Sequence, residues 1–274
     1  MATDKQLSMA ASAIALRGVR LFLSAGRNAM ERRAQPAAEP AKHRPKPKPV
    51  VPGARPPQKV FDMLARTSKF NKHELEALYA MYRRLVTAAQ GILPPTAIGQ
   101  PPAKVDGIDQ GTFRDVMHNT FDMITEEAIL ERIWITWDRG ASGGEGALKF
   151  EAWVRGLSVL LRGTEEERRN HCFAVYDLNA DGYITRDEMF VLLKNSLLKQ
   201  PGDEDPDEGV RDLVELVLRK MDVDKDGRVS PEDYKDAVEQ EPLLLEAFGQ
   251  CLPSRRHALA FLKTLNPKPK DLRS

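Results

Sequence analysis

The chain has 274 residues, of which 42% are hydrophobic and 30% are charged, so it has room for about two domains with buried cores. No apolar run approaches the length of a membrane-spanning helix, and we therefore expect no membrane partner. Its only cysteines, Cys172 and Cys251, disfavour a disulfide-rich secreted scaffold and favour a reducing compartment such as the cytoplasm.

The net charge of +1 conceals an asymmetry along the chain. Residues 1–60 hold twelve Lys and Arg against three Asp and Glu, whereas acidic residues outnumber basic ones in the remainder by 37 to 29. A basic arm, residues 1–58, joined to an acidic body indicates that the two parts have different tasks.

Within this arm, residues 7–30 are predicted to form a basic amphipathic helix, with Arg17, Arg20 and Arg27 clustered away from the apolar arc. Three interpretations are open. The helix packs on the body or on a partner, it docks on an acidic surface through its arginines, or it is a mitochondrial presequence.

The second half of the arm, residues 34–58, has eight prolines among twenty-five residues and is predicted to be extended. It is either a stiff linker or a polycation that lies along an acidic polymer, such as the surface of tubulin or a nucleic acid. No aromatic residues are interleaved to stack on bases, so we expect no nucleic acid partner. A linker with nonspecific electrostatic contact is the favoured interpretation.

The next region, residues 59–162, has the helix–loop–helix rhythm of two EF-hands. Helical spacing is found near residues 60–64, 74–88, 110–120, 126–137 and 150–161. In the loop after Trp137, Asp138 is followed by Gly140 and Ser142 where further carboxylates are needed, so this loop is not expected to bind calcium. Such degenerate hands persist because paired hands share a core. Three tryptophans belong either to this core or to a partner surface: Trp134, Trp137 and Trp153.

Two copies of a twelve-residue pattern follow, at residues 177–188 (DLNADGYITRDE) and 222–233 (DVDKDGRVSPED). We call them the first loop and the second loop. Both fit the calcium loop of an EF-hand, which has side-chain oxygens at positions 1, 3 and 5, glycine at position 6 and a carboxylate at position 12. A tandem pair at this spacing is a strong signal for two Ca²⁺ sites.

Six residues of each loop occupy ligand positions. In the first loop these are Asp177, Asn179, Asp181, Tyr183 through its carbonyl, Thr185 directly or through water, and Glu188 with both oxygens. In the second loop they are Asp222, Asp224, Asp226, Arg228, Ser230 and Asp233. Because aspartate is one methylene shorter than glutamate, we expect a weaker second site with some Mg²⁺ occupancy.

The flanking residues carry helix-start and pairing signals. Thr164, Thr185 and Ser230 are predicted N-caps, and Ile184 is predicted to pair with Val229 between the loops.

Seven apolar residues line either a calcium-opened groove or an ordinary core: Met189, Phe190, Leu193, Leu197, Leu213, Leu216 and Met221. Residues 242–253 are predicted to form an apolar helix that fills this groove or is displaced by a partner, and a last helix is expected over residues 256–265.

Several segments together resemble the calaxin family, the calcium-binding regulators of outer-arm dynein in cilia and flagella. The match covers residues 60–253 and rests chiefly on NSLLKQP (195–201), EDPDEG (204–209), LLLEAFG (243–249) and CLP (251–253). Shorter agreements occur at residues 70–72, 113–114, 156–157 and 161–163. The family's last hand also has Asp at position 12, but its middle hand carries regular ligands, which the Asp138 loop lacks. The basic arm has no counterpart, so a divergent paralogue with an added arm would explain both departures.

The resemblance implies an all-α, two-lobed EF-hand fold. The expected division is the arm at 1–58, an amino-terminal lobe of degenerate hands at 59–162, a calcium lobe at 163–252, and a helix and tail at 253–274. The implied partners are dynein heavy chains, the coiled coils of the docking complex and, for the basic arm, tubulin of the doublet microtubule in the axoneme.

The leading hypothesis is a noncatalytic calcium sensor or adaptor on the outer dynein arm. A static axonemal scaffold and a generic intracellular EF-hand sensor are the alternatives. The five histidines are scattered, and no nucleophile–base grouping or phosphate-binding loop is present, so we expect no enzyme.

Overall fold

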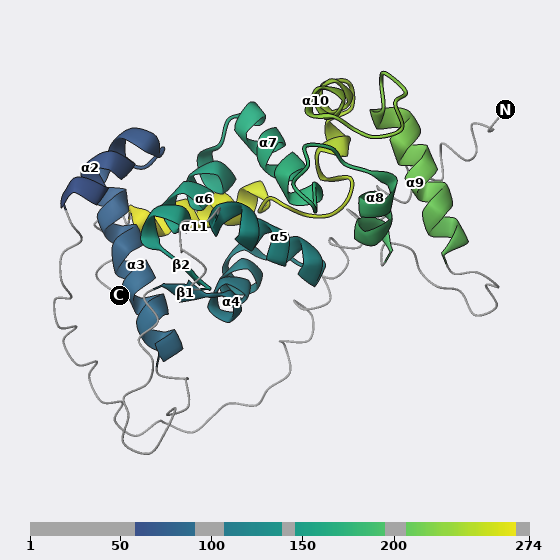
Figure 1. The fold of residues 1–274 in the computed structure, drawn as a ribbon. Helices are drawn as coiled ribbons and strands as arrows, with labels where there is room; N and C mark the ends of the chain where they lie inside the picture. Colours follow the sequence, from purple (N-terminus) through teal and green to yellow (C-terminus); the bar gives the residue numbers. More distant parts are fainter. Residues whose placement is uncertain (1–57, 91–106, 139–145, 195–206, 267–274) are drawn as a thin grey trace, which may run out of the picture. The chain divides into compact units, whose positions relative to one another are not determined.

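The computed structural model describes residues 58–90, 107–138, 146–194 and 207–266, and these form helices with one two-stranded sheet (Figure 1). The chain divides into Met1–Arg55 and Pro56–Ser274, and every described residue belongs to the second unit. The predicted helix of residues 7–30 and the proline-rich segment therefore lie outside the described residues. The prediction of a mostly helical EF-hand fold is confirmed.

Five helices form the amino-terminal hands, close to their predicted positions. They are α2 (Gln58–Thr67), α3 (Lys72–Gln90), α4 (Gln110–Phe121), α5 (Glu127–Asp138) and α6 (Phe150–Arg162). Apolar side chains recur along one face of each helix and are buried, which is the pattern that helices in a shared core require.

The strands of these hands pair in the way that EF-hand loops pair. β1 (Ile108–Asp109) runs antiparallel to β2 (Ala147–Leu148), with Ile108 opposite Leu148. The Tyr82 hydroxyl on α3 donates a hydrogen bond to the carbonyl oxygen of Leu148 at 3.1 Å. This geometry supports an EF-hand pair in which Leu148 holds the pairing position. The loop predicted to have lost its ligands falls largely at 139–145, outside the described residues.

The three tryptophans lie in the core of the amino-terminal hands, as one of the two interpretations held. Their rings surround Phe113, with centroid distances of 5.2 Å to Trp134, 5.3 Å to Trp137 and 6.4 Å to Trp153. A Cβ atom at Gly156 would fall 2.1 Å from the Trp137 ring, so only glycine lets α6 approach so closely. All three rings are buried.

Four helices form the carboxy-terminal hands: α7 (Glu165–Tyr176), α8 (Arg186–Leu193), α9 (Glu208–Met221) and α10 (Pro231–Gln240). The predicted N-caps Thr164, Thr185 and Ser230 are confirmed, and each forms a complete capping box with the residue three positions later. These reciprocal bonds satisfy backbone donors at the helix starts and fix where each loop ends.

The apolar residues of these hands form an ordinary core in this structure. Met189, Leu193, Leu213 and Met221 are buried. Phe190 and Leu216 are half-buried, whereas Leu197 lies outside the described residues.

The predicted helix over residues 242–253 is wrong in type and extent. The chain forms a short 3₁₀ helix, η2 (Pro242–Glu246), and continues without helical structure to Pro253. The Glu246 carboxylate accepts hydrogen bonds from the backbone N–H groups of Cys251 at 2.8 Å and Leu252 at 2.9 Å. These bonds fold the chain back on itself, so a continuous helix cannot form. Burial raises the pKa of Glu246.

This segment occupies the interior of its own hands, which was one of the two alternatives. The Tyr176 hydroxyl donates to the carbonyl oxygen of Gly249 at 2.6 Å, and the Tyr234 hydroxyl donates to that of Leu245 at 2.5 Å. Phe248 is fully buried and packs edge-on against Tyr176, with a centroid distance of 5.0 Å. The segment is therefore integral to the core between α7 and α10.

The last helix, α11 (Arg255–Leu265), packs against α3, α4 and α6 of the amino-terminal hands. Phe261 contacts Phe121 with a centroid distance of 5.1 Å, and Leu265 is fully buried. The carboxy-terminal helix is thus part of the amino-terminal core.

Candidate calcium sites

The first loop is folded by hydrogen bonds from its own backbone to its side-chain oxygens. Asp177 accepts from the N–H groups of Asp181 at 3.1 Å and Gly182 at 3.0 Å, while Asn179 accepts from Asp181 at 2.9 Å. Asp181 in turn accepts from the N–H of Tyr183 at 2.9 Å. Gly182 has a φ of +90°, which lets the chain bend around these oxygens. The loop therefore gathers the side-chain oxygens of positions 1, 3 and 5.

Glu188 joins the two ends of the first loop. Its Oε1 accepts from the N–H groups of Leu178 at 2.8 Å and Asn179 at 3.1 Å. Its Oε2 accepts from both the N–H and the hydroxyl of Thr185, each at 2.8 Å. This buried carboxylate lies at the start of α8, within reach of the opening residues of the loop. It is placed to offer two oxygens to a cation.

The second loop repeats this arrangement. Asp222 accepts from the N–H groups of Asp226 at 3.1 Å and Gly227 at 2.9 Å, and Asp224 accepts from Asp226 at 3.1 Å. Carboxylate oxygens of Asp222, Asp224 and Asp226 all lie within 4.8 Å of one another. The hydrogen bond from the Asp226 N–H lowers the pKa of Asp224, but desolvation and the charges of Asp226 and Asp233 outweigh it and raise the pKa overall.

Asp233 reaches the start of its loop less completely than Glu188 does. Its Oδ2 accepts from the N–H of Ser230 at 3.0 Å and from the hydroxyl at 2.7 Å, but Oδ1 accepts only from the N–H of Val223 at 3.2 Å. The Asp233 side chain is also one methylene shorter than that of Glu188. The weaker second site stays a prediction, and this geometry is its physical basis.

The two loops are connected to each other and to the amino-terminal hands. Ile184 and Val229 exchange two backbone hydrogen bonds of 2.9 Å and are fully buried, which confirms the predicted pairing. Arg186 donates to the carbonyl oxygen of Gly227 at 2.7 Å. From α5, Arg132 donates to the carbonyl oxygen of Ala174 at 3.2 Å and also to that of Asp177. The ligand pattern gave no signal for either arginine.

The donors in both loops fit a hard divalent cation. Carboxylate, amide and hydroxyl side chains and the carbonyls at position 7 supply only oxygen, which is the ligand atom that Ca²⁺ and Mg²⁺ prefer. No sulfur or imidazole donor belongs to either loop. The loops are already bent by their own hydrogen bonds, so an ion would meet an organised set of oxygens.

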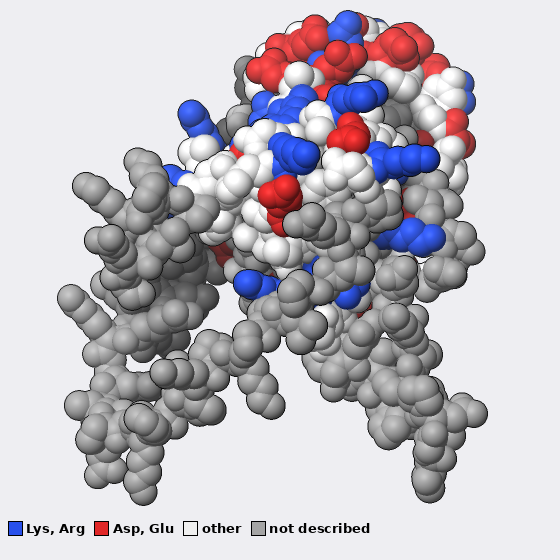
Figure 2. All heavy atoms as spheres, turned by 90° about the vertical axis from the view of Figure 1, so that its left-hand side faces the viewer, with Lys and Arg blue, Asp and Glu red and all other residues white. Residues whose placement is uncertain are grey.

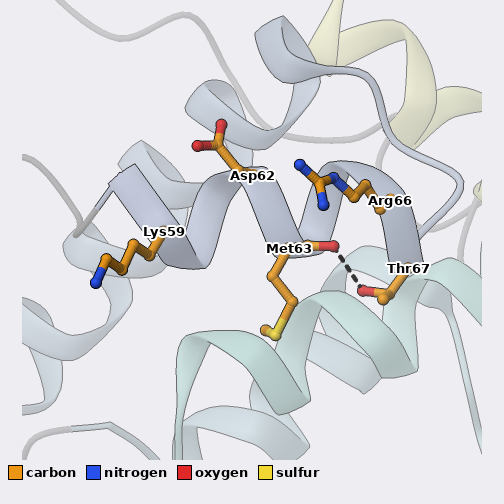
Figure 3. Close-up of a pocket in the computed structure, with 5 residues that line it drawn as sticks. All are labelled: Lys59, Asp62, Met63, Arg66 and Thr67. Atoms are coloured by element: carbon orange, nitrogen blue, oxygen red, sulfur yellow. Dashed lines mark hydrogen bonds between the residues drawn. The ribbon is translucent and has the colours of Figure 1, made fainter.

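One hollow of the described surface lies apart from the two loops. A shallow hollow lies against α2 and is lined by Lys59, Asp62, Met63, Arg66 and Thr67 (Figure 3). All five come from one helix, and none is a histidine, a cysteine or one of a pair of carboxylates. No helix among the described residues has the length and apolar character needed to cross a bilayer.

The fold and the paired loops define an EF-hand protein, and the model of the EF-hand domain pair matches residues 166–239. Three calaxins are similar to most of the chain. Calaxin of Xenopus laevis is 48% identical over 207 residues, which cover 74% of this chain and 92% of that protein. Calaxin of Homo sapiens is 45% identical over 207 residues, which cover 74% of this chain and 90% of that protein. Calaxin of Danio rerio is 45% identical over 205 residues, covering 74% and 91%. The chain belongs to the calaxin family.

Proposed function

We propose that this protein is a calcium sensor of the ciliary or flagellar axoneme that acts at the outer dynein arm. Membership of the calaxin family together with an EF-hand pair supports a calcium-binding regulator rather than an enzyme. The observation that carries the proposal is the pair of preorganised oxygen-lined loops joined by the Ile184–Val229 bridge.

The proposed ligands are the twelve loop residues named from the sequence. The first site, closed by Glu188, is the tighter Ca²⁺ site, and the second, closed by Asp233, binds Ca²⁺ more weakly and accepts some Mg²⁺. The proposed division into an arm at 1–58, an amino-terminal lobe at 59–162, a calcium lobe at 163–252 and a carboxy-terminal segment at 253–274 confines ion sensing to the calcium lobe.

Direct contacts between the first loop and the amino-terminal hands favour a sensor over a static scaffold. Arg132 on α5 binds the carbonyl oxygen of Asp177, which is the first ligand residue. α5 also packs along α7, the helix that enters this loop. A change in backbone position at Asp177 on ion binding would therefore act on α5 through Arg132.

A calcium titration followed by calorimetry and tryptophan fluorescence tests this proposal. We expect heat from two sites and a change in tryptophan emission, both over micromolar calcium. All three tryptophans lie on α5 and α6, outside the hands that hold the loops. Their emission therefore reports transmission of the signal and not binding itself.

The double variant Glu188→Gln and Asp222→Asn is the matched control, because it removes one ligand charge from each loop. This variant should show neither heat nor an emission change. Heat without an emission change in the unmodified protein would favour the static scaffold, and the absence of both would exclude the calcium sensor.

The proposed partners are those that the family resemblance implies: dynein heavy chains, the docking-complex coiled coils and tubulin of the doublet microtubule. Charge supports a role for the arm, residues 1–58, toward an acidic partner such as tubulin. Acidic side chains gather at the top of the face in Figure 2. Because this end of the body is acidic, it is not expected to attract the acidic surface of tubulin.

Deletion of residues 1–58 should weaken co-sedimentation with doublet microtubules several-fold, because the arm is net positive whereas the rest of the chain is net negative. The effect should shrink as salt rises from about 50 to 200 mM, since exposed charges are screened. A full-length variant with the lysines of residues 42–48 changed to glutamine is the control for charge alone. If the natural chain, the deletion variant and the glutamine variant co-sediment equally, the arm does not contribute to microtubule binding and is only a linker.

A further inference from the structure

Arg228 lies between the two loops and contacts both. It occupies position 7 of the second loop, the same position that Tyr183 occupies in the first. Its guanidinium carbon lies 3.6 Å from the centroid of the Tyr183 ring, and its Nε donates to Oδ2 of Asp226 at 2.9 Å. One side chain is therefore stacked on the first loop and paired with a carboxylate of the second.

This pairing changes the charge that a cation would meet in the second loop. Asp226 is one of the three clustered carboxylates, and the hydrogen bond from Arg228 lowers its pKa. The second loop has one ligand carboxylate more than the first, whose position 3 is Asn179. The guanidinium offsets this extra charge, and its own positive charge repels a divalent cation at short range.

Tyr183 explains why the guanidinium stays beside the site. A planar guanidinium over an aromatic face is held both by stacking and by the charge distribution of the ring. Only the backbone carbonyl of Tyr183 is a proposed ligand, so its ring is available for this contact. Without the ring, only the ion pair with Asp226 would hold this exposed side chain, and its charge could turn further into solvent.

We infer that Arg228 lowers and thereby sets the calcium affinity of the second site, and that Tyr183 of the first loop positions it there. This inference rests on the proposed function of the two loops. It adds a side-chain link between the sites to the backbone link of Ile184 with Val229. A residue of the first loop then controls the affinity of the second.

The test measures the second site alone, in full-length protein carrying Glu188→Gln to silence the first. Adding Arg228→Gln should tighten calcium binding about fivefold in calorimetry, because a positive charge near the ion is removed. Adding Tyr183→Leu instead of Arg228→Gln should tighten binding about twofold, since the arginine remains but is held by Asp226 alone. A variant that merely loosened the loop would bind calcium less tightly, so a purely structural role predicts the opposite sign.

The control is Lys235→Gln in the same background, which removes one positive charge from an exposed position on α10. It should change the dissociation constant by less than about 1.5-fold, because a screened surface charge acts weakly. Equal or weaker binding after Arg228→Gln would overturn the inference while leaving the second loop a calcium site. Absence of binding with and without Arg228 would overturn this inference and the second site of the proposed function together.

Discussion

Replacing Glu188 by glutamine is expected to weaken calcium binding at the first site until calorimetry no longer detects it, and to leave calcium binding at the second site intact. Glutamine keeps the length of the side chain but loses the charge and one of the two oxygens that a bidentate ligand supplies. Loss of the ligand at position 12 should weaken the first site by about 100-fold or more, because affinity in these loops follows ligand charge and number. Calorimetry should then resolve one binding event in place of two.

The fold should survive this substitution. The Glu188 carboxylate accepts hydrogen bonds from the start of the loop and from Thr185 at the start of α8. The amide oxygen of glutamine can keep one of these roles, and the Thr185 hydroxyl still caps the helix. The cost to the free energy of unfolding should be about 1 kcal/mol, measured by denaturant unfolding without calcium.

Asp187→Asn provides the matched control, since it removes the same charge from the neighbouring position. Asp187 is exposed in the first turn of α8 and has no place in the ligand set. This variant should retain two binding events with little change in affinity. Two undiminished sites after Glu188→Gln would instead show that Glu188 is not a ligand.

The parts of the fold that were predictable depend on short stretches of sequence. The helix starts at Thr164, Thr185 and Ser230 follow from capping chemistry within four residues. The Ile184–Val229 bridge follows from applying the EF-hand loop pattern to each copy. These features were predictable because their geometry is set locally and repeated twice.

Other features depend on contacts between residues far apart, for which the sequence contains no periodic signal. An apolar run such as residues 242–253 does not distinguish a helix from an irregular buried segment, and the Glu246 hydrogen bonds decided the outcome. The return of α11 to the amino-terminal hands and the stacking of Arg228 on Tyr183 likewise required the tertiary structure. The only hint of the contact between Arg228 and Tyr183 in the sequence was a basic residue at position 7 of the second loop.

Glu74 is the clearest example of such a long-range dependence, because one buried carboxylate joins three separate segments. It forms a two-bond ion pair with Arg162 of α6, at 2.8 Å and 2.6 Å, and accepts from the N–H of Asn71 at 3.0 Å. The side-chain amide of Asn266, which follows α11, donates to it at 2.6 Å across 192 positions of sequence. Arg162 also donates to the carbonyl oxygen of Lys69 at 2.6 Å.

Replacing Glu74 by glutamine should lower the free energy of unfolding by about 3 kcal/mol at pH 7. The change leaves Arg162 without its counter-charge. It also places the N–H₂ of the glutamine amide opposite N–H groups that donate to the carboxylate in the natural chain, so that donors face donors. Arg162 keeps 30% of its side chain exposed, so water limits the loss to the lower end of the range for broken buried pairs. Glu76→Gln, at an exposed position of the same helix, should change stability by less than about 0.5 kcal/mol.

The stabilisation by Glu74 should also depend on pH in a defined window. The hydrogen bond from Arg162 is the main cause that lowers the pKa of Glu74 from 4.5 to about 2 in the folded protein. A carboxyl whose pKa is lowered by folding stabilises the protein above its unfolded value, and this contribution is lost as the pH falls from 4.5 toward 2. Denaturant unfolding at pH 7 and at about pH 3 should therefore show a smaller difference between the natural chain and Glu74→Gln at the lower pH. A difference that does not change with pH would mean that the shape of the Glu74 side chain, and not its charge, joins the three segments.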